Sequence, residues 1–300
     1  HATNHTQQRY KQLNKKLYEM KKLNLLLAFL IGFILFNCSS DDNSNTQEEP
    51  QNSQIVRTIQ RIYDLDNSSL LEERIVIDYN NGKPILWSFY DNTNQLTFTE
   101  ELNYSNNGLL TSIQGFLSDG TSYSETSITY DSSNRILQRI YNEEDGSYNE
   151  TISFIYNNNN TITSETNSNG FTSSKIFELN DDGIIYREIQ NGNIVVSVNY
   201  NNFNPISKTS FSTTYTYEYL NSGNLPSFSS IFGSNPANVV LVGNSLANQS
   251  DSLTTELISK ITSDTSTQEF IYILNDNNYP ISMQNFSNGN LRNEYEYIYE

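Results

Sequence analysis

Cysteine and histidine are almost missing from this 300-residue chain, which contains one cysteine, Cys38, and two histidines, His1 and His5. Both histidines precede Cys38, so the chain beyond that point has no histidine and no second thiol. Ser-His-Asp and Cys-His catalysis, histidine-bound zinc and thiol redox chemistry all require those side chains. Carboxylate chemistry, calcium or no chemistry remain, and we predict a protein that is not an enzyme and holds no cofactor or metal.

Basic residues are also scarce, and six of the 17 lysines and arginines precede Cys38. The rest of the chain keeps 11 basic residues against 33 acidic ones, a net charge of −22. Nucleic-acid backbones are bound by lysine and arginine side chains that release counterions from the phosphates. We therefore expect no nucleic-acid partner.

The apolar stretch at residues 23–36 is short, because its roughly 14 residues fall below the ~20 that a membrane-spanning helix needs. Two lysines precede it, and Cys38 and a polar segment follow it. A basic start, a short apolar centre and an abrupt polar switch are typical of a secretory signal. We expect residues 20–37 to be the signal peptide, and residues 1–19 to be a non-native or mis-assigned extension before Met20.

The segment Leu35-Phe36-Asn37-Cys38 resembles the lipobox of bacterial lipoprotein precursors, with Asn37 in the place of the usual small residue. The resemblance implies that Cys38 is diacylated, palmitate being one such acyl group, and becomes the mature N-terminus. Residues 39–42, Ser-Ser-Asp-Asp, are similar to the acidic export tag that takes some lipoproteins to the outer face of the outer membrane. A lipid-anchored outer-membrane protein exposed at the cell surface is implied, with a periplasm-facing position as the alternative.

Residues 38–54 are polar and lack apolar periodicity, which is typical of a flexible tether. Beyond them the sequence repeats, with a tyrosine or leucine before each turn at spacings of 25, 26, 26, 23 and 21 residues: Tyr79, Tyr104, Tyr130, Tyr156, Leu179 and Tyr200. Self-similarity of this length indicates a repeat architecture. We assign residues 55–300 to one repeat β-meander domain.

Each repeat contains strands and tight turns. Residues 149–156 alternate between apolar and polar side chains, and residues 193–200 do the same, with Ile194, Val196 and Val198 on one face. Such alternation predicts strands with one dry and one wet face. Asn, Asp and Gly tolerate the positive φ of hairpins, and they recur at 80–82, 106–108, 119–120, 145–146, 169–170, 182–183, 191–192 and 288–289.

The resulting fold class is all-β, an antiparallel up-and-down meander, because parallel strands would need crossover connections. Residues 55–299 give about 16 to 18 strands, more than an open twisted sheet usually holds. We expect a curled, barrel-like or half-barrel-like sheet. An integral outer-membrane barrel shares this alternation, but a lipid anchor would then be redundant, and alternate Ser, Thr, Asn and Glu suit water better than lipid.

The repeat is interrupted between residues 221 and 261. Residues 252–260 predict a short helix capped by Asp251 or Ser252, so the fold has one short helix in the 225–262 insertion. A closing pair of strands then resumes at 268–274 and 291–299.

Two family resemblances follow from these motifs. Residues 128–137, Ile-Thr-Tyr-Asp-Ser-Ser-Asn-Arg-Ile-Leu, are similar to the tyrosine-aspartate (YD) repeat of RHS-type proteins. The chain also resembles a family of secreted bacterial lipoproteins of unknown function with a porin-like meander, through Asn235-Pro236, the helix at 252–260 and Asn278-Tyr279-Pro280. The second resemblance implies a fold and a location, and it brings no catalytic residues.

Adjacent carboxylates at Glu72-Glu73, Glu100-Glu101 and Glu143-Glu144 raise the alternative of glycoside hydrolysis, which needs two facing carboxyl groups. Neighbours on a strand point to opposite faces, so we expect one member of each pair to be simply solvated. Residues 64–68 have the oxygen spacing of a calcium loop, but they lack its glycine and its final glutamate. An ordinary acidic turn is the favoured interpretation.

Aromatic residues supply the remaining candidates for ligand contacts. Tyr215, Tyr217 and Tyr219 share one face of a strand and could form a platform for sugar rings, although aromatic stripes more often build sheet cores. Trp87, the one tryptophan, is the first choice for a ligand contact if it is exposed. We predict a non-catalytic binding or structural module for a glycan or a surface protein. The alternatives are a carboxylate-dependent glycan-active enzyme and an accessory component of an outer-membrane export or uptake complex.

Overall fold

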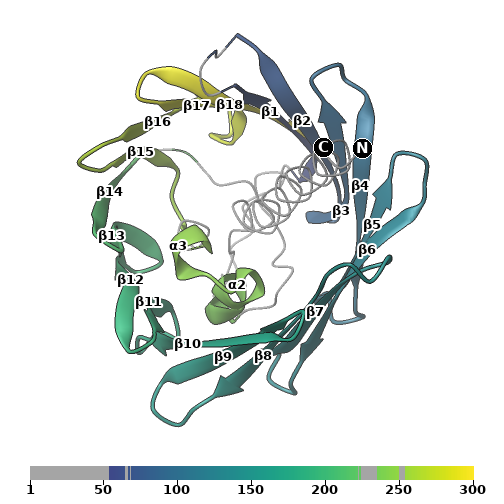
Figure 1. Ribbon diagram of the computed structural model, residues 1–300. Coiled ribbons are helices and arrows are strands. Elements are labelled where there is room, and N and C mark those ends of the chain that lie inside the picture. Colours follow the sequence, from purple (N-terminus) through teal and green to yellow (C-terminus); the bar gives the residue numbers. More distant parts are fainter. Residues whose placement is uncertain (1–53, 65–66, 68, 222, 224–234, 250–253) are drawn as a thin grey trace, which may run out of the picture.

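A closed barrel of antiparallel strands forms the molecule. The computed structural model describes residues 54–64, 67, 69–221, 223, 235–249 and 254–300. In these residues each strand pairs with the strands before and after it, and β18 pairs with β1, so the 18-stranded sheet closes on itself (Figure 1). The predicted all-β meander of 16 to 18 strands is confirmed. The sequence does not decide whether the sheet closes, and the structure shows that it does.

The strands follow the chain order around the barrel without a crossover. They are β1 (Ile55–Tyr63), β2 (Leu71–Asn80), β3 (Lys83–Asp91), β4 (Leu96–Tyr104), β5 (Leu110–Leu117), β6 (Ser122–Tyr130), β7 (Ile136–Glu143), β8 (Asn149–Tyr156), β9 (Thr161–Ser168), β10 (Phe171–Leu179), β11 (Ile185–Gln190), β12 (Asn193–Asn201), β13 (Asn204–Ser210), β14 (Thr213–Tyr219), β15 (Ile258–Thr262), β16 (Thr267–Leu274), β17 (Pro280–Ser287) and β18 (Asn290–Tyr299). Even-numbered strands therefore all finish at the same end of the barrel.

A repeated tyrosine ties neighbouring strands together at that end. Six even-numbered strands carry a tyrosine at or near their last residue, and its hydroxyl donates to a backbone carbonyl at the start of the preceding strand, over 2.6 to 2.9 Å. The pairs are Tyr104–Pro84, Tyr130–Leu110, Tyr156–Ile136, Tyr219–Pro205, Tyr272–Ile258 and Tyr299–Pro280. Burial raises the pKa of Tyr130 and Tyr156 well above its ordinary value, so both remain donors. We call this end the tyrosine end.

The turn that follows the tyrosine is built by an Asp or Asn side chain. Asp131 Oδ1 accepts from the backbone N–H groups of Ser133 and Arg135 at 2.8 and 2.9 Å, and Asn134 takes the left-handed conformation with φ of 60°. Asn180 and Asn275 cap their turns in the same way. Such side chains mimic a backbone turn and tolerate positive φ. The abundance of Asn and Asp in the repeats follows from this geometry.

The interruption after β14 folds into the barrel. Within the described residues it contains α2 (Pro236–Gly243) and α3 (Leu246–Gln249), which lie inside the ring of strands (Figure 1). Asn235 caps α2 by accepting from the backbone N–H of Ala237, and proline fits the first turn. None of the described helices has both the length and the apolar character that crossing a membrane requires. We call α2 and α3 together the plug.

The predicted helix at residues 252–260 is wrong in position. Residues 252–253 lie outside the described part, and Ile258 already begins β15. The helix forms instead at Pro236–Gly243, where an Asn-Pro start and the apolar run Val239–Leu241 let it be capped and buried. Pro236, which lies in the segment that interrupts the repeat, is therefore the start signal of the helix.

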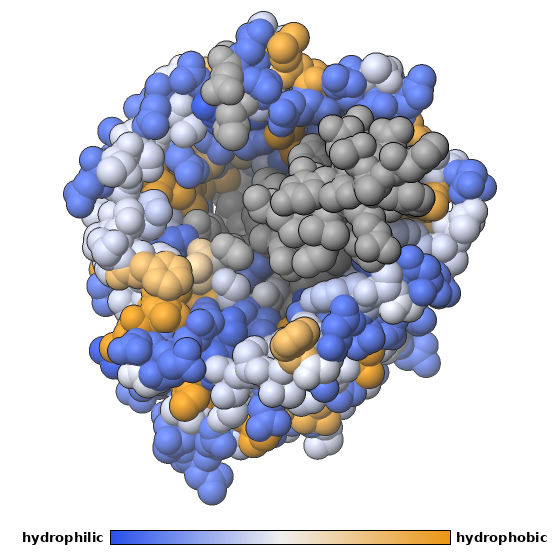
Figure 2. Space-filling view, in the orientation of Figure 1, coloured by the Kyte–Doolittle hydropathy of each residue, from blue (hydrophilic) through white to orange (hydrophobic). Residues whose placement is uncertain are grey.

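The inner face of the barrel wall carries the buried apolar side chains, and the outer face mixes exposed glutamates with exposed apolar residues such as Ile155 and Ile273. On β8, Ile152 and Phe154 are 1% and 3% exposed and face the interior, as the alternation predicts. Ile194 is an exception, because a bulge in the pairing of β11 and β12 sets it opposite Ile189 and it is 55% exposed, away from the face of Val196. Exposed glutamates occupy outward strand positions around much of the barrel: Glu101, Glu125, Glu165, Glu218 and Glu269. The face seen along the barrel is likewise mostly hydrophilic (Figure 2).

Candidate functional site

The plug is held against one side of the barrel interior. In the described residues α2 contacts β7 and β11, and α3 contacts β11 and β12. Asn238 of α2 is fully buried, accepts from the backbone N–H of Ile136 at 3.0 Å and donates to the carbonyl of Asn134 at 2.7 Å. We call the inner face of β7 to β13, which carries these contacts, the plug wall.

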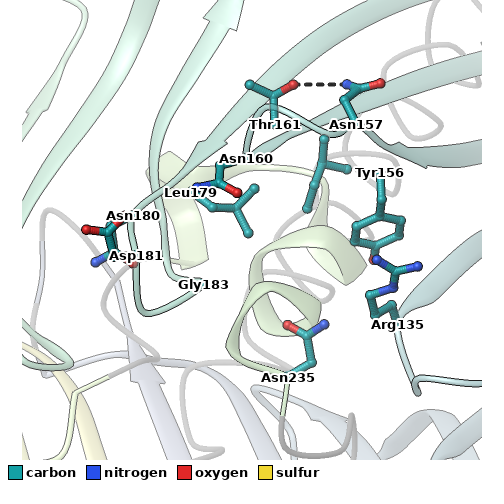
Figure 3. Close-up of a pocket in the computed structure, with 11 residues that line it drawn as sticks. Arg135, Tyr156, Asn157, Asn160, Thr161, Leu179, Asn180, Asp181, Gly183 and Asn235 are labelled. Carbon is teal, nitrogen blue, oxygen red and sulfur yellow. Dashed lines mark hydrogen bonds between the residues drawn. The ribbon is translucent and has the colours of Figure 1, made fainter.

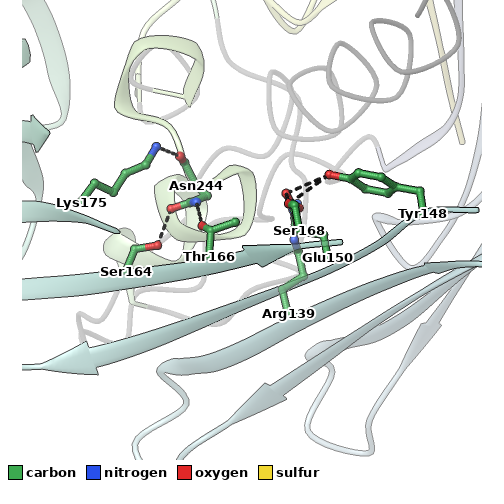
Figure 4. A network of polar contacts seen from close by, with 8 residues as sticks. All are labelled: Arg139, Tyr148, Glu150, Ser164, Thr166, Ser168, Lys175 and Asn244. Carbon is green, nitrogen blue, oxygen red and sulfur yellow. Dashed lines mark hydrogen bonds and ion pairs between the residues drawn. The ribbon is translucent and has the colours of Figure 1, made fainter. Parts of the chain in front are cut away.

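Polar side chains of the plug wall meet the junction of the two plug helices (Figure 4). Ser164 donates to Asn244 Oδ1 at 2.7 Å, and Asn244 Nδ2 donates to Thr166 Oγ1 at 3.1 Å. Lys175 Nζ donates to the backbone carbonyl of Asn244. It also forms an ion pair of 2.9 Å with the buried Glu188, which in turn accepts from the backbone N–H at the start of α3 over 2.8 Å. Each buried charge here has a partner of opposite charge or a backbone dipole.

A second network on the plug wall joins β7, β8 and β9 (Figure 4). Arg139, which is 6% exposed, pairs with Glu150, and Glu150 also accepts from Tyr148 and Ser168 at 3.3 and 3.1 Å. Burial lowers the pKa of Arg139, and the neighbouring Glu150 carboxylate opposes that shift. Burial also raises the pKa of Tyr148. The arrangement is a structural network in which the buried Arg139 charge is paired with a carboxylate.

A groove of about 260 Å³ opens between successive turns at the tyrosine end (Figure 3). Its apolar part comes from the side chains of Ile162, Leu179 and Tyr156, and Arg135 lies over the Tyr156 ring at 4.2 Å. Its polar rim is made of side chains from two turns and the cap of α2: Asn157, Asn160, Thr161, Asn180, Asp181 and Asn235. An amide-rich rim around a small apolar floor suits a neutral polar ligand.

The inner wall of β3 to β6, which we call the tryptophan wall, has a different character. Trp87 on β3 is directly opposite Glu100 on β4, and both are buried, at 3% and 7% exposure. The Trp87 indole N–H is buried without a hydrogen-bond partner, and the Glu100 carboxyl makes no hydrogen bond within the described part of the chain. Burial raises the pKa of Glu100 to about 8, so this carboxyl is protonated at neutral pH.

The next positions along the tryptophan wall are small. Gly115 is opposite Glu100, and Ser124 is opposite Gly115. A Cβ on Gly115 would lie 2.5 Å from Ser124 Oγ and 2.6 Å from the Phe98 ring, so only glycine fits beneath that ring. The row ends at Glu143 on β7, which accepts from Tyr123 at 3.2 Å and from Ser147.

The structure accounts for the carboxylate pairs and for one residue that sequence reasoning missed. Glu101 and Glu144 are exposed whereas Glu100 and Glu143 are buried, so one member of each of these pairs is solvated, as expected. The sequence does not indicate that the two buried members belong to one register row of the interior. The sequence did hold one signal for Glu100. It falls on the inward-facing positions of its own strand, the face that it shares with Trp87 of the neighbouring strand.

The aromatic candidates lie inside the barrel and not on its surface. Trp87 is buried, and so is Tyr217 at 7% exposure, while Tyr215 and Tyr219 are half-buried. Lys208 lies over the rings of Tyr215 and Tyr217 at 5.6 and 5.9 Å. An exposed sugar platform on β14 is therefore not what the fold builds, and the ligand roles of these residues stay predictions.

Two further predicted features fall partly or wholly outside the described residues. Cys38 lies there, and so do residues 65, 66 and 68 of the acidic turn after β1. Among the described residues of that turn, Asn67 donates its backbone N–H to Asp64 Oδ1 at 2.7 Å. No group of three or more His, Cys, Asp or Glu side chains in the described residues could hold a metal ion.

The fold and these sites define an antiparallel up-and-down β-barrel with an internal helical plug. No protein-family profile matches the chain, and no curated protein matches it in sequence. Among solved structures, a porin-like protein from Bacteroides uniformis aligns with 83% of this chain and 98% of its own, at 16% identity and a TM-score of 0.42. A structure of TcdB2-TccC3 aligns with 51% of this chain at 10% identity and a TM-score of 0.22, and this alignment covers only 12% of that much longer chain.

Proposed function

We propose that this chain is a lipid-anchored protein of the bacterial outer membrane whose barrel works in water, at the cell surface, as a non-catalytic binding or structural module. The observation that carries the proposal is that exposed glutamates interrupt the exposed apolar side chains of the outer wall. A barrel embedded in lipid needs an outward apolar band about 25 Å tall. Here Glu101, Glu125 and Glu165 are exposed at outward positions of β4, β6 and β9.

Cross-strand pairs on the outer wall support the same proposal. Arg57 pairs with Asp78 at 2.5 Å, Arg187 with Glu178 at 3.2 Å, and Gln284 donates to Glu294 at 2.8 Å. Charged and amide side chains on the strands would be costly against hydrocarbon, whereas in water they need no compensation. A lipid at Cys38 would then supply the membrane contact that the barrel wall does not make.

The interior favours a binding or structural role over conduction. The backbone of β7 and side chains of β9, β10 and β11 bind the plug through buried or partly buried hydrogen bonds. The groove at the tyrosine end, with its rim of amides, is the exposed feature that best fits a ligand such as a glycan or a loop of a surface protein.

The test is membrane fractionation of cells that express the full chain, its Cys38→Ala variant and, as the matched control, Ser39→Ala. We expect the parent and the control to be labelled by radioactive palmitate and to remain with outer membranes. Cys38→Ala should lose the label and enter the soluble fraction as a folded barrel without detergent. Retention of unlabelled Cys38→Ala in carbonate-washed membranes would contradict the proposal, because the wall itself would then be the membrane anchor.

A further inference from the structure

We propose that the tryptophan wall is a binding site for a neutral sugar ring, with Trp87 and Glu100 as its polar contacts. The inference deepens the proposed function, on which it rests, by naming a site and a ligand class. It starts from the Trp87 indole N–H, which is buried without a hydrogen-bond partner, and from the buried Glu100 opposite it, whose carboxyl has no hydrogen bond within the described chain.

Unpaired buried polar groups are rare in folded proteins, because each costs the free energy of its lost hydration. Trp87 and Glu100 are opposite each other in the β3–β4 register and face the same interior, so two such groups meet at one place. A single molecule that accepts from the indole N–H and exchanges hydrogen bonds with the carboxyl would satisfy both.

The charge state of Glu100 selects the kind of ligand. Burial keeps this carboxyl protonated at neutral pH, so it both donates and accepts hydrogen bonds and carries no charge. A cationic ligand would find no negative charge on Glu100. An anionic ligand would find no positive charge on Trp87, because the indole is neutral. A hydroxyl group, which donates and accepts in the same way, is the matching partner.

The surroundings of Glu100 fit the apolar faces of a sugar ring. Aromatic rings follow one another along the wall, with Trp87 and Phe89 6.2 Å apart, Phe89 and Phe98 5.9 Å apart, and Phe98 edge-on to Tyr123 at 5.7 Å. Ligand sites typically combine such aromatic lining with a few well-placed polar groups. Gly115, between Glu100 and Ser124, has no side chain, and the Phe98 ring packs over it.

The plug packs mainly against strands other than those of the tryptophan wall. The strong contacts of α2 and α3 are with β7, β11 and β12, on the plug wall. There, the buried Glu188 is paired with Lys175 of β10 and with the backbone N–H at the start of α3. The tryptophan wall has the same kind of inward polar residues without such a partner in the described chain.

The experiment uses Trp87 as its own reporter, since it is the only tryptophan in the chain. The purified full chain is titrated at pH 7 with glucose, galactose, mannose, N-acetylglucosamine, maltose and cellobiose, up to about 50 mM, which covers millimolar dissociation constants. We expect at least one of these neutral sugars to shift or quench the Trp87 emission saturably, and glucuronate to be bound more weakly.

Three variants separate the site from general effects. Glu100→Gln keeps the shape and both hydrogen-bonding roles and should bind within about threefold of the parent, whereas Glu100→Leu should weaken binding about tenfold or more. Glu101→Leu, which changes the exposed neighbour on the same strand, should leave binding unchanged. Circular dichroism of each variant checks that the barrel is folded.

The inference is overturned if none of the sugars changes the Trp87 emission, which would mean that water alone satisfies these groups. It is also overturned if Glu100→Leu and Glu101→Leu bind alike while both are folded. The proposed function fails by a different result, the membrane retention of unlabelled Cys38→Ala, so the two failures are distinguishable.

Discussion

The plug wall and the tryptophan wall are built from the same repeat, yet a buried glutamate is paired on the first and unpaired in the described chain on the second. On the plug wall, Glu188 remains beside Lys175 at 2.9 Å and accepts from the start of α3. On the tryptophan wall, Glu100 has no such neighbour in the described chain, and its pKa rises to about 8. Glu188 has two partners that Glu100 lacks, Lys175 of the neighbouring strand and the start of α3 in the plug.

The comparison shows that a barrel of this width needs something inside it. Side chains alone fill barrels of about eight strands, and wider ones enclose a lumen. On one side of this lumen the insertion after β14 supplies backbone and side-chain partners, so charged residues can be buried as pairs. On the other side a carboxyl takes up a proton instead, because a lone buried charge costs more than protonation.

The largest effect is expected where the plug wall loses a charge. Glu188→Ala removes the partner of Lys175 and the acceptor of the Leu246 N–H, and should lower the free energy of unfolding by about 3 kcal/mol or more. The matched change on the outer wall, Glu178→Ala, breaks a partly exposed pair with Arg187 and should cost about 1 kcal/mol or less. Urea unfolding at pH 7 measures both. Equal losses would mean that the plug does not bury Glu188.

A smaller effect should be common to both walls. Tyr130→Phe acts on the tryptophan wall and Tyr156→Phe on the plug wall, and each removes a hydroxyl that donates to a buried carbonyl. We expect each to cost about 1.5 kcal/mol in urea unfolding, because the tie belongs to the repeat and not to the plug. Tyr186→Phe, which alters a hydroxyl without a hydrogen bond in the described residues, is the control. A much larger loss for Tyr156→Phe would make the tie part of the plug contact.

Much of this fold could be predicted from local pattern. Alternation on β8 and the Asn and Asp turns fix strands, faces and antiparallel order, since each is a property of a few adjacent residues. The plug helix could not be placed as well, because Pro236 is both a breaker of strands and a favoured first residue of helices. The meeting of Glu100 with Trp87 inside the lumen depends on closure and register, and closure is set by the pairing of β1 with β18, more than 230 residues apart in the chain.

The central claim, that Glu188 and Glu100 differ because only Glu188 has partners in the described chain, is tested most directly by the pH dependence of unfolding. In the native protein the pKa of Glu100 is raised from 4.5 to about 8, so between these values the native state holds a proton that the unfolded state has lost. The stability linked to this group is complete below pH 4.5, is lost as pH rises toward about 8, and changes no further above it.

The measurement compares urea unfolding of the parent, Glu100→Gln and Glu101→Gln from pH 4.5 to 9. The account predicts that the free energy of unfolding of Glu100→Gln, relative to that of the parent, rises by about 1.4 kcal/mol for each pH unit between the two pKa values. Glu101→Gln, whose side chain is exposed on the same strand, should follow the parent at every pH. Parallel curves for the parent and Glu100→Gln would contradict the account, because Glu100 would then be paired or solvated like its neighbour.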